Sequence, residues 1–412
     1  MTGRPRLAVR LAALLVVIGA VGWRRGEYFA GSLDPVVVAK ACVSLVALAL
    51  AVVAVSAQPA ARRRLGTGSM WVLGILLGGS VFGALTYGNL VAGGVVAVRV
   101  ALIGATMVLL LRAASGLQVL ISIAWACGIV AVTATLTGLP TLAEGRLAGR
   151  IPAIDPNELA LLAGVVVVVL AWRAVLGEAG LAAAVAGAFF LAVVWATGSR
   201  TGLLMLLLGV LVMALYVRRP QVGLVVGGLV FGAFGALAVV ATGAVGGFLE
   251  RGGDGTSTLD SRFIAWREAL VWATSDWQTV LGGGLSVKII RVRGQYWDTQ
   301  PLDSTWASLL VQTGVLGFVV AAAWICWTVR GALLAPRPHR VLFLGLLAFL
   351  VGRSLLESGL FDATTAFVLF VAISLVAEGG SRARLRVEAQ EAWGGTDVSA
   401  DAAVDRAPAT SR

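Results

Sequence analysis

Long apolar runs separated by short polar connections make up most of the 412-residue chain. A helix needs roughly 20 mostly apolar residues to cross a bilayer, and many of these runs approach that length. They lack the period-2 alternation of a membrane β-strand, and in hydrocarbon the backbone must pair within helices or a closed barrel. The pattern therefore predicts an all-α, polytopic membrane protein with about 12 transmembrane helices.

The candidate spans form a block of nine, a long polar loop and a block of three. The predicted domains are transmembrane helices 1–9 in residues 1–242, an extracytoplasmic loop with short amphipathic helices and part of the active site in 243–303, transmembrane helices 10–12 in 304–379 and a disordered cytoplasmic tail in 380–412. In chain order the spans are Leu7–Trp23, Pro35–Ala57, Met70–Tyr87, Leu90–Leu111, Leu117–Gly138, Glu158–Trp172, Gly180–Thr197, Thr201–Val217, Val222–Gly243, Thr305–Val329, Val341–Glu357 and Phe361–Ala377.

Arginines beside the spans predict the orientation, because cytoplasmic loops are enriched in basic residues. If the N-terminus is cytoplasmic, every cytoplasmic loop carries an arginine and the C-terminus is cytoplasmic too. Residues 139–157, 198–200 and 243–303 then face outside. Trp23-Arg24-Arg25 stands where a signal peptide would have small residues, so the first run is expected to stay as a helix.

The net charge of +11 at pH 7 does not indicate a nucleic-acid partner, because no stretch interleaves basic and aromatic residues. Loop arginines account for the charge. Cys42, Cys127 and Cys326 lie inside apolar runs, without the spacing of a disulfide framework or a metal site. No cofactor is predicted, and the lipid bilayer is the partner that the composition implies.

The predicted outer side gathers cationic residues that break the arginine bias. A guanidinium presents a planar fork of donors that matches phosphate oxygens, so an outward basic pocket suits a lipid-linked phosphate. Arg200 stands in a very short turn between two apolar runs, where it either reaches toward lipid headgroups or serves a functional site. The set comprises Arg146, Arg150, Arg200, Arg262, Arg267, Lys288, Arg291 and Arg293.

The loop contains a predicted amphipathic helix over Thr258–Ser275. Arg262 lies one turn before Trp266. The helix either lies on the bilayer with its charges solvated or turns Arg262 into a cavity above the membrane. Gly282-Gly283-Gly284, which follows, is typical of a flexible turn more than of an anion cradle. The apolar stripe at helical spacing comprises Leu259, Phe263, Trp266 and Leu270.

Two further outer positions have a structural and a functional interpretation. Asp303 directly precedes the tenth span. Its carboxylate either caps that helix, a role that Ser304 fits equally well, or takes a proton from an attacking hydroxyl. Arg353 and Glu357 are four residues apart near the outer end of the eleventh span, which favours an ion pair on one helix face.

Several short motifs follow one another between Leu139 and Gly317. In their order they resemble the Arg-x-x-Gly, Pro-Asn, Ser-Arg-Thr-Gly, Arg-x-x-x-Trp and Gly-x-Gly patterns of the O-antigen ligase and polymerase family of membrane glycosyltransferases. Twelve helices also fit that family. The motifs are Arg146-Leu147-Ala148-Gly149 with Asp155-Pro156-Asn157, Gly198-Ser199-Arg200-Thr201-Gly202, Arg262 with Trp266, Gly282 with Gly284, and the stretch from Asp303 to Gly317.

The resemblance implies that a glycan is transferred or polymerised from an undecaprenyl pyrophosphate donor onto an acceptor hydroxyl, without a metal. The reaction would take place on the outer face of the bacterial cytoplasmic membrane. Arg146, Arg200 and Arg262 would hold the donor pyrophosphate, and Arg200 is also expected to act in catalysis by stabilising the leaving charge. The predicted supporting residues are Asn157, Trp266 and Arg353.

The sequence departs from the family at the base. The family's proposed base is a histidine in a His-Asn-x-x-Leu stretch, and here that position holds Asp303 while the next holds Ser304. A carboxylate is ionised at neutral pH and still accepts a proton, so Asp303 is the predicted catalytic base. The change favours a polymerase, or a ligase with a different acceptor.

Two other classes of protein stay open. A transporter or flippase for a lipid-linked or sugar substrate suits the span count, and Lys40 and Arg99 lie deep in predicted spans. Transporter folds commonly show internal repeats, and none is visible here. The second alternative is a scaffold subunit of an envelope assembly that keeps the fold without the activity.

Overall fold

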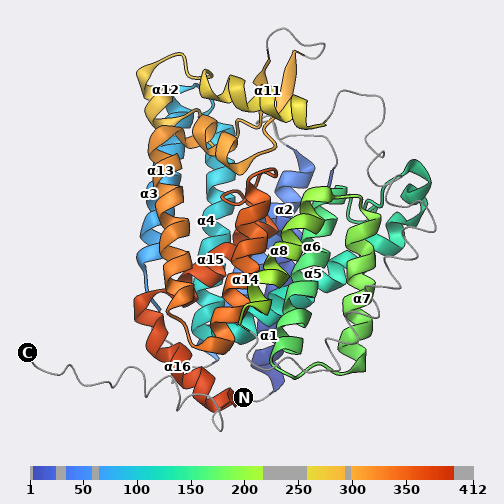
Figure 1. Ribbon diagram of the computed structural model, residues 1–412. Helices are drawn as coiled ribbons and strands as arrows, with labels where there is room; N and C mark the ends of the chain where they lie inside the picture. The colour runs from blue at the N-terminus through green and yellow to red at the C-terminus, as the bar shows by residue number, and fades with distance from the viewer. Residues whose placement is uncertain (1–2, 25–33, 58–64, 217–257, 293–297, 394–412) are drawn as a thin grey trace, which may run out of the picture.

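Helices make up most of the chain in a computed structural model that describes residues 3–24, 34–57, 65–216, 258–292 and 298–393 (Figure 1). Six helical segments in these ranges are long and apolar enough to cross a membrane, so the chain is a membrane-embedded helical protein. They are α2 (Pro35–Ser56), α3 (Gly68–Thr86), α4 (Leu90–Ala113), α5 (Gly116–Gly138) with the 3-10 turn η2 (Leu139–Glu144), α6 (Pro156–Val175) and α13 (Thr305–Leu333).

Five further helices complete the bundle in the described ranges. Three are shorter apolar helices, α7 (Leu181–Ala196), α8 (Arg200–Ala214) and α15 (Thr365–Ala377), and two carry more charge, α1 (Gly3–Ala20) and α14 (Arg337–Ser354). Eleven of the predicted spans coincide with α1–α8 and α13–α15. The predicted span Val222–Gly243 lies outside the described residues, so the total of twelve stays a prediction.

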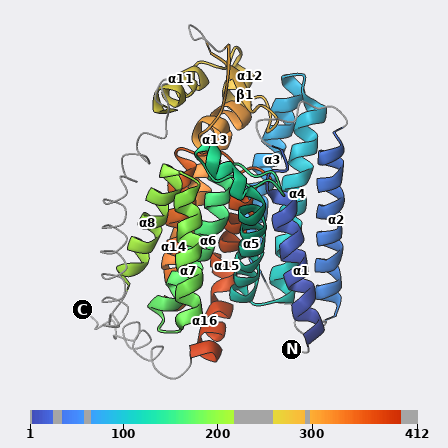
Figure 2. The same cartoon turned by 90° about the vertical axis from the view of Figure 1, so that its right-hand side faces the viewer.

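One end of the bundle carries the described part of the long loop, and we call it the loop end. There α11 (Thr258–Leu270) and α12 (Asp276–Leu281) lie across the helices, followed by the antiparallel strands β1 (Ile289–Arg291) and β2 (Thr299–Pro301), which pair Ile290 with Gln300 (Figure 1). The helix α1 begins and the helix α16 (Gly379–Trp393) lies at the opposite end (Figure 2).

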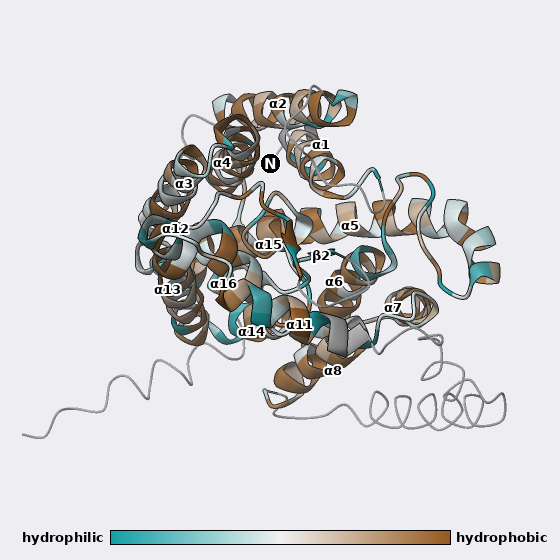
Figure 3. Cartoon of the chain, turned by 90° about the horizontal axis from the view of Figure 1, so that it is seen from above, coloured by the Kyte–Doolittle hydropathy of each residue, from teal (hydrophilic) through white to brown (hydrophobic). Residues whose placement is uncertain are grey.

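The helix α15 lies at the centre of the bundle when the molecule is seen end-on (Figure 3). Almost all of its 13 residues are buried, including Phe367 and Phe370, and Trp324 of α13 packs against Phe370. A helix that is apolar all round is suited to such a position. Because α15 is surrounded by protein, the bilayer thickness does not set its length.

Lys40 and Arg99 stabilise the end of α1. The Lys40 ammonium donates to the Val21 carbonyl oxygen at 2.6 Å, and Arg99 donates to the Gly19 carbonyl oxygen at 3.3 Å. Carbonyls at a helix C-terminus lack intrahelical donors and carry partial negative charge, so cations there are favourable. Glu158 accepts the Gly22 amide beside them. These deep charges thus hold α1, α2, α4 and α6 together.

The helix α13 is broken at Gly314, whose φ of +64° and ψ of −169° interrupt the hydrogen-bond ladder. The Gly283 and Gly284 amides donate to the carbonyls of Val311 and Gln312 at 2.8 and 2.9 Å. An open carbonyl at this depth needs a partner. The glycine triplet after α12 therefore docks on α13, and these amides are not available to an anion. The segment is a turn, as predicted, but these hydrogen bonds fix it to α13.

The described part of the tail also differs from prediction. Residues 379–393 form α16, where disorder was predicted from residue 380. Its Arg384 donates to the Leu111 and Ala114 carbonyls at the C-terminal end of α4, at 3.0 and 2.7 Å. The Glu378 carboxylate just before α16 accepts the Gly68 amide at the start of α3. Each charge complements the helix dipole that it meets.

Candidate active site at the loop end

Arg146 and Arg353 meet at Asn157, in the first turn of α6. The Arg146 guanidinium donates to the Asn157 side-chain oxygen at 3.2 Å and, through Nε, to the Thr197 carbonyl at 2.9 Å. Arg353 donates to the Asn157 backbone carbonyl at 2.9 Å. Nη1 of Arg146 makes no hydrogen bond with the described part of the chain. The contacts orient Arg146 and leave one edge of its fork available.

Arg262 of α11 holds the second half of the site. Its Nη1 donates to the Leu356 carbonyl at 2.8 Å, its Nη2 lies 3.5 Å from the Glu357 carboxylate, and its Nε lies 3.8 Å from Asp303 Oδ2. All three nitrogens of this guanidinium therefore face protein oxygens. The predicted amphipathic helix does turn Arg262 inward, since only 16% of its side chain is exposed.

Asp303 was expected either to cap α13 or to act as a base, and the residue that caps α13 is not Asp303. Ser304 is the N-cap, because its hydroxyl accepts the Trp306 amide at 3.3 Å. The Asp303 carboxylate is left facing Arg262, with 42% of the side chain exposed. Partial burial raises the pKa of Asp303, and Arg262 opposes that rise. A carboxylate of this kind can reach a ligand from outside.

Electrostatic contacts connect the two halves. Burial lowers the pKa of Arg146. The carboxylates of Glu357 and Asp155 act to raise that pKa, and the charges of Arg200 and Arg262 act to lower it. Burial raises the pKa of the Glu357 carboxyl, while Arg353 and Arg262 lower it. Side chains from the 146–155 loop, α8, α11 and the end of α14 therefore lie close enough to influence one another's charge.

Arg200 is the first residue of α8, and the Ser199 hydroxyl caps that helix by accepting the Gly202 amide at 3.2 Å. Arg200 is exposed. Arg146 donates to the carbonyl of Thr197, three residues before Arg200, so the start of α8 lies near the Arg146 contact. The position at the helix terminus fits both interpretations of the sequence, a headgroup contact and a ligand contact.

Two predicted features of this region are wrong. Glu357 lies just beyond the last residue of α14. Its amide still donates to the Arg353 carbonyl at 2.8 Å, but in the described part of the chain its ion pair is with Arg262 and not with Arg353. The predicted helix Thr258–Ser275 ends at Leu270. Its buried face carries Ala265 and Ala269, whereas Phe263 is 58% and Leu270 74% exposed. Phe263 and Leu270 of the apolar stripe therefore face away from the protein, because Arg262 on another side of the helix faces the carboxylates.

Trp266 lies beside Arg262 on α11 and is partly buried. Its ring stacks edge-on with Phe263, with centroids 5.4 Å apart, and its buried indole nitrogen has no hydrogen-bond partner in the described residues. Of the other predicted cations, Arg150, Arg267 and Arg291 are exposed, and Arg293 lies outside the described residues.

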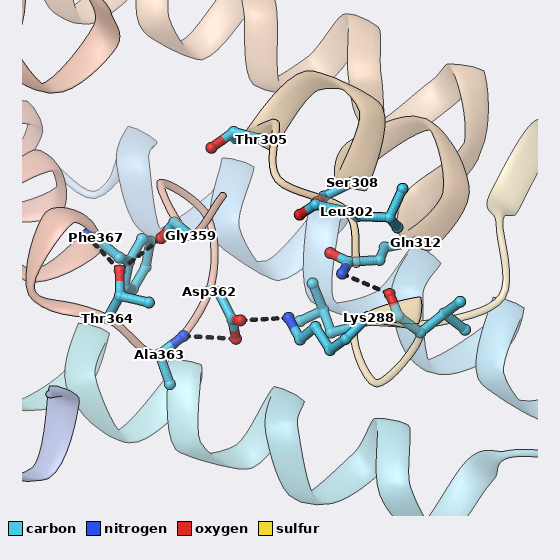
Figure 4. A network of polar contacts seen from close by, with 12 residues as sticks. Lys288, Leu302, Thr305, Ser308, Gln312, Gly359, Asp362, Ala363, Thr364 and Phe367 are labelled. Atoms are coloured by element: carbon cyan, nitrogen blue, oxygen red, sulfur yellow. Dashed lines mark hydrogen bonds and ion pairs between the residues drawn. The ribbon is translucent and has the colours of Figure 1, made fainter. Parts of the chain in front are cut away.

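Lys288, the residue before β1, belongs to a neighbouring polar network (Figure 4). It forms an ion pair with the partly buried Asp362, in the loop between α14 and α15. Burial acts to raise the pKa of Asp362, but Lys288 holds it below its usual value. The Gln312 amide donates to the Val287 carbonyl at 2.9 Å. The network attaches the hairpin to the bundle.

Glu357 is the site residue that sequence reasoning missed, because it was assigned to a structural pair. The signal was present: an acidic side chain at the end of an apolar run is costly unless it has a partner. Asp362 was overlooked for the same reason, inside the predicted twelfth span. No protein-family model matches the chain, and no curated protein matches it either.

Proposed function

We propose that this protein is an integral membrane glycosyltransferase of the O-antigen ligase and polymerase type. It would transfer or polymerise glycan from an undecaprenyl pyrophosphate donor onto an acceptor hydroxyl, at the outer face of the bacterial cytoplasmic membrane. One observation carries the proposal: at the loop end Arg262 contacts both Asp303 and Glu357, and Arg146 is linked to this group through Asn157 and Arg353.

The contacts divide the arginines into two roles. Arg146 keeps one edge of its guanidinium open, and the exposed Arg200 follows three residues after the Thr197 carbonyl that Arg146 contacts, so these two would bind the donor pyrophosphate. Arg262 already contacts Leu356, Glu357 and Asp303, so we assign it the positioning of the carboxylates. Asn157 orients Arg146, and Arg353 holds Asn157.

The reaction follows from these positions. The acceptor hydroxyl attacks the anomeric carbon of the donor sugar, and its proton passes to the Asp303 carboxylate. The bond between that carbon and the pyrophosphate oxygen breaks. Arg146 and Arg200 then stabilise the negative charge that grows on the leaving pyrophosphate.

The transporter alternative draws on Lys40 and Arg99, the deep charges of the predicted spans. Both side chains donate to carbonyls at the end of α1. They therefore have a structural partner, and we favour the enzyme. An assay that follows the donor across the bilayer and measures its turnover distinguishes the two functions.

The proposal is tested by glycan transfer in proteoliposomes that contain an undecaprenyl pyrophosphate oligosaccharide and a panel of acceptors. We expect Asp303→Asn and Arg200→Ala to lower kcat by at least about 100-fold, the usual effect of removing an acid–base or charge-stabilising group. Asp298→Asn and Arg150→Ala, exposed residues of the same end, are matched controls and should keep wild-type rates.

Each other outcome is informative. A wild-type rate in Asp303→Asn would remove Asp303 as the base. Donor that crosses the bilayer unchanged, with no product from any acceptor, would replace the enzyme by a transporter. Equal losses of kcat in the control variants would show that activity is sensitive to any substitution at the loop end, and the roles assigned to Asp303 and Arg200 would be rejected.

A further inference from the structure

The guanidinium of Arg262 faces two carboxylates, and it does not face them equally. Its Nη2 lies 3.5 Å from the Glu357 carboxylate, whereas its Nε lies 3.8 Å from Oδ2 of Asp303. The side chain of Glu357 is 17% exposed and that of Asp303 is 42% exposed. Opposite charges attract more strongly where less water surrounds them. Arg262 therefore interacts more strongly with Glu357 than with Asp303.

The other contacts of Arg262 also direct it toward the end of α14. Nη1 donates to the Leu356 carbonyl at 2.8 Å, so two of the three nitrogens contact the consecutive residues 356 and 357. Nε faces Asp303 at 3.8 Å, which is too long for a hydrogen bond. A carboxylate that accepts hydrogen bonds from a cation is a weaker base. The arrangement spares Asp303 that contact.

The backbone holds Glu357 in place independently of its carboxylate. The amide and the hydroxyl of Thr305 donate to the Glu357 carbonyl at 3.2 and 2.9 Å. The Glu357 amide donates to the Arg353 carbonyl at 2.8 Å. These bonds remain whatever side chain stands at position 357. A change of its charge should therefore leave the local fold intact.

Charged groups from several elements act on Glu357. Burial raises the pKa of its carboxyl, while Arg353 of α14 and Arg262 of α11 lower that pKa. The charge of Asp303 acts to raise it, and Glu357 in turn acts to raise the pKa of Arg146. Repulsion between like charges is mutual. An ionised Glu357 therefore also favours the protonated form of Asp303.

We infer that Glu357 is a positioning residue, whose carboxylate takes up most of the charge of Arg262 and so keeps Asp303 a stronger base than Arg262 alone would allow. The role of Asp303 as a base rests on the proposed function, whereas the sharing of Arg262 does not. In this role Glu357 acts through Arg262 and needs no contact with the substrate.

The first arm of the test measures the protonation of Asp303 without any glycan donor. Dicyclohexylcarbodiimide modifies carboxyls in their protonated form, and mass spectrometry of the Asp303 peptide gives the modified fraction at each pH. In Glu357→Gln, the amide oxygen can still accept from Arg262, but the negative charge is gone. We expect the midpoint of labelling at Asp303 to move to lower pH by about 0.5 or more, because an unopposed cation lowers the pKa of a carboxyl.

The second arm follows glycan transfer in the same variants. The acidic limb of kcat/KM should move to lower pH in Glu357→Gln, together with the labelling midpoint. Glu357→Asp keeps the charge and should keep the wild-type midpoint. Glu144→Gln is the matched control, because Glu144 is an exposed glutamate near Arg146 in the chain, and it should leave both profiles unchanged.

Two labelling results would overturn the inference. An unchanged midpoint in Glu357→Gln would show that Glu357 only anchors Arg262, since glutamine keeps that contact. A midpoint at higher pH would show that Arg262 has moved away from Asp303. A midpoint at lower pH in a protein that transfers no glycan would keep the sharing of Arg262 and reject the proposed function. Transfer with an unchanged midpoint would keep the enzyme and reject the role of Glu357.

Discussion

Asn157 illustrates how single residues prepare the candidate site before any ligand binds. Its side chain accepts from Arg146 and its backbone from Arg353. Two guanidinium groups are thus held by one residue at the start of a helix. Because Arg146 is already oriented, less side-chain freedom is lost when it meets a phosphate.

The protonation of Asp303 sets the expected pH dependence. A base must be deprotonated, so transfer should fall as the pH falls through the Asp303 pKa, which partial burial raises above its usual value. Arg262 lowers this pKa, so Arg262→Gln should move the acidic limb of kcat/KM to higher pH. The measurement is a pH–rate profile for both proteins.

The matched control is Arg267→Gln on the exposed side of α11, which should leave the profile of the wild type unchanged. A shift of the acidic limb toward lower pH in Arg262→Gln would contradict the assigned contact between Arg262 and Asp303.

Spacing alone could not assign these residues, as Glu357 shows. Four-residue spacing predicted a pair with Arg353, but α14 ends at Ser354 and the chain turns Glu357 toward α11. The boundary of a helix depends on packing that the sequence does not display locally. By contrast, Ser304 and Asp303 were both recognised as residues at a helix start, and only the three-dimensional arrangement decided which one caps it.

At the scale of elements, the break of α13 at Gly314 leaves carbonyls to which the loop attaches. The amides of Gly283 and Gly284 satisfy the carbonyls that Gly314 leaves open. A side chain at Gly314 would collide with the Val280 backbone, and L residues rarely adopt its φ of +64°. The loop therefore attaches to the bundle through backbone contacts, which only glycine permits.

Gly314→Ala should destabilise the protein by at least about 1–3 kcal/mol, the cost of backbone strain at such a position. The thermal midpoint in detergent should fall. Gly74→Ala on α3 is the control, because its added methyl meets open space and alanine favours a helix. An unchanged midpoint in Gly314→Ala would contradict the role of the break.

Hydropathy predicted the helices well because lipid constrains them strongly: a run such as Pro35–Ala57 has few other ways to satisfy its backbone. It left the orientation of the loop helix open. Of the two alternatives for α11, the structure has Arg262 on the inner face, while Phe263 and Leu270 of the apolar stripe are exposed. Outside the hydrocarbon core, the contacts of Arg262 with Asp303 and Glu357 determine how α11 is oriented, and its apolar periodicity does not.

At the scale of the whole molecule, α16 joins the ends of helices that are distant in sequence. Arg384 donates to two carbonyls at the end of α4 and pairs with Glu388 at 2.7 Å. The low hydropathy of this segment predicted disorder. The sequence does not show that its charged side chains contact the ends of other helices. Its order comes from helix ends that the rest of the bundle presents.

Arg384→Gln should therefore lower the stability of the folded protein by about 1.5–3 kcal/mol, the range for hydrogen bonds to a charged group. We expect a lower thermal midpoint and faster tryptic cleavage within residues 379–393. Arg386→Gln, an exposed neighbour on the same helix, is the control. Equal behaviour of the two variants would show that α16 does not depend on its contact with α4.

The cations at the end of α1 have a consequence for how the chain is made. A lysine or arginine within a lone helix raises the cost of its partitioning into lipid, by roughly 2.5–3.5 kcal/mol at the helix centre, where Arg99 lies, and by less nearer a helix end, where Lys40 lies. The carbonyls that accept Lys40 and Arg99 belong to the segment just after α1 and to its last turn. During synthesis, α2 and α4 should therefore enter the lipid more readily while α1 is still next to the translocon. These helices would then be inserted as a group.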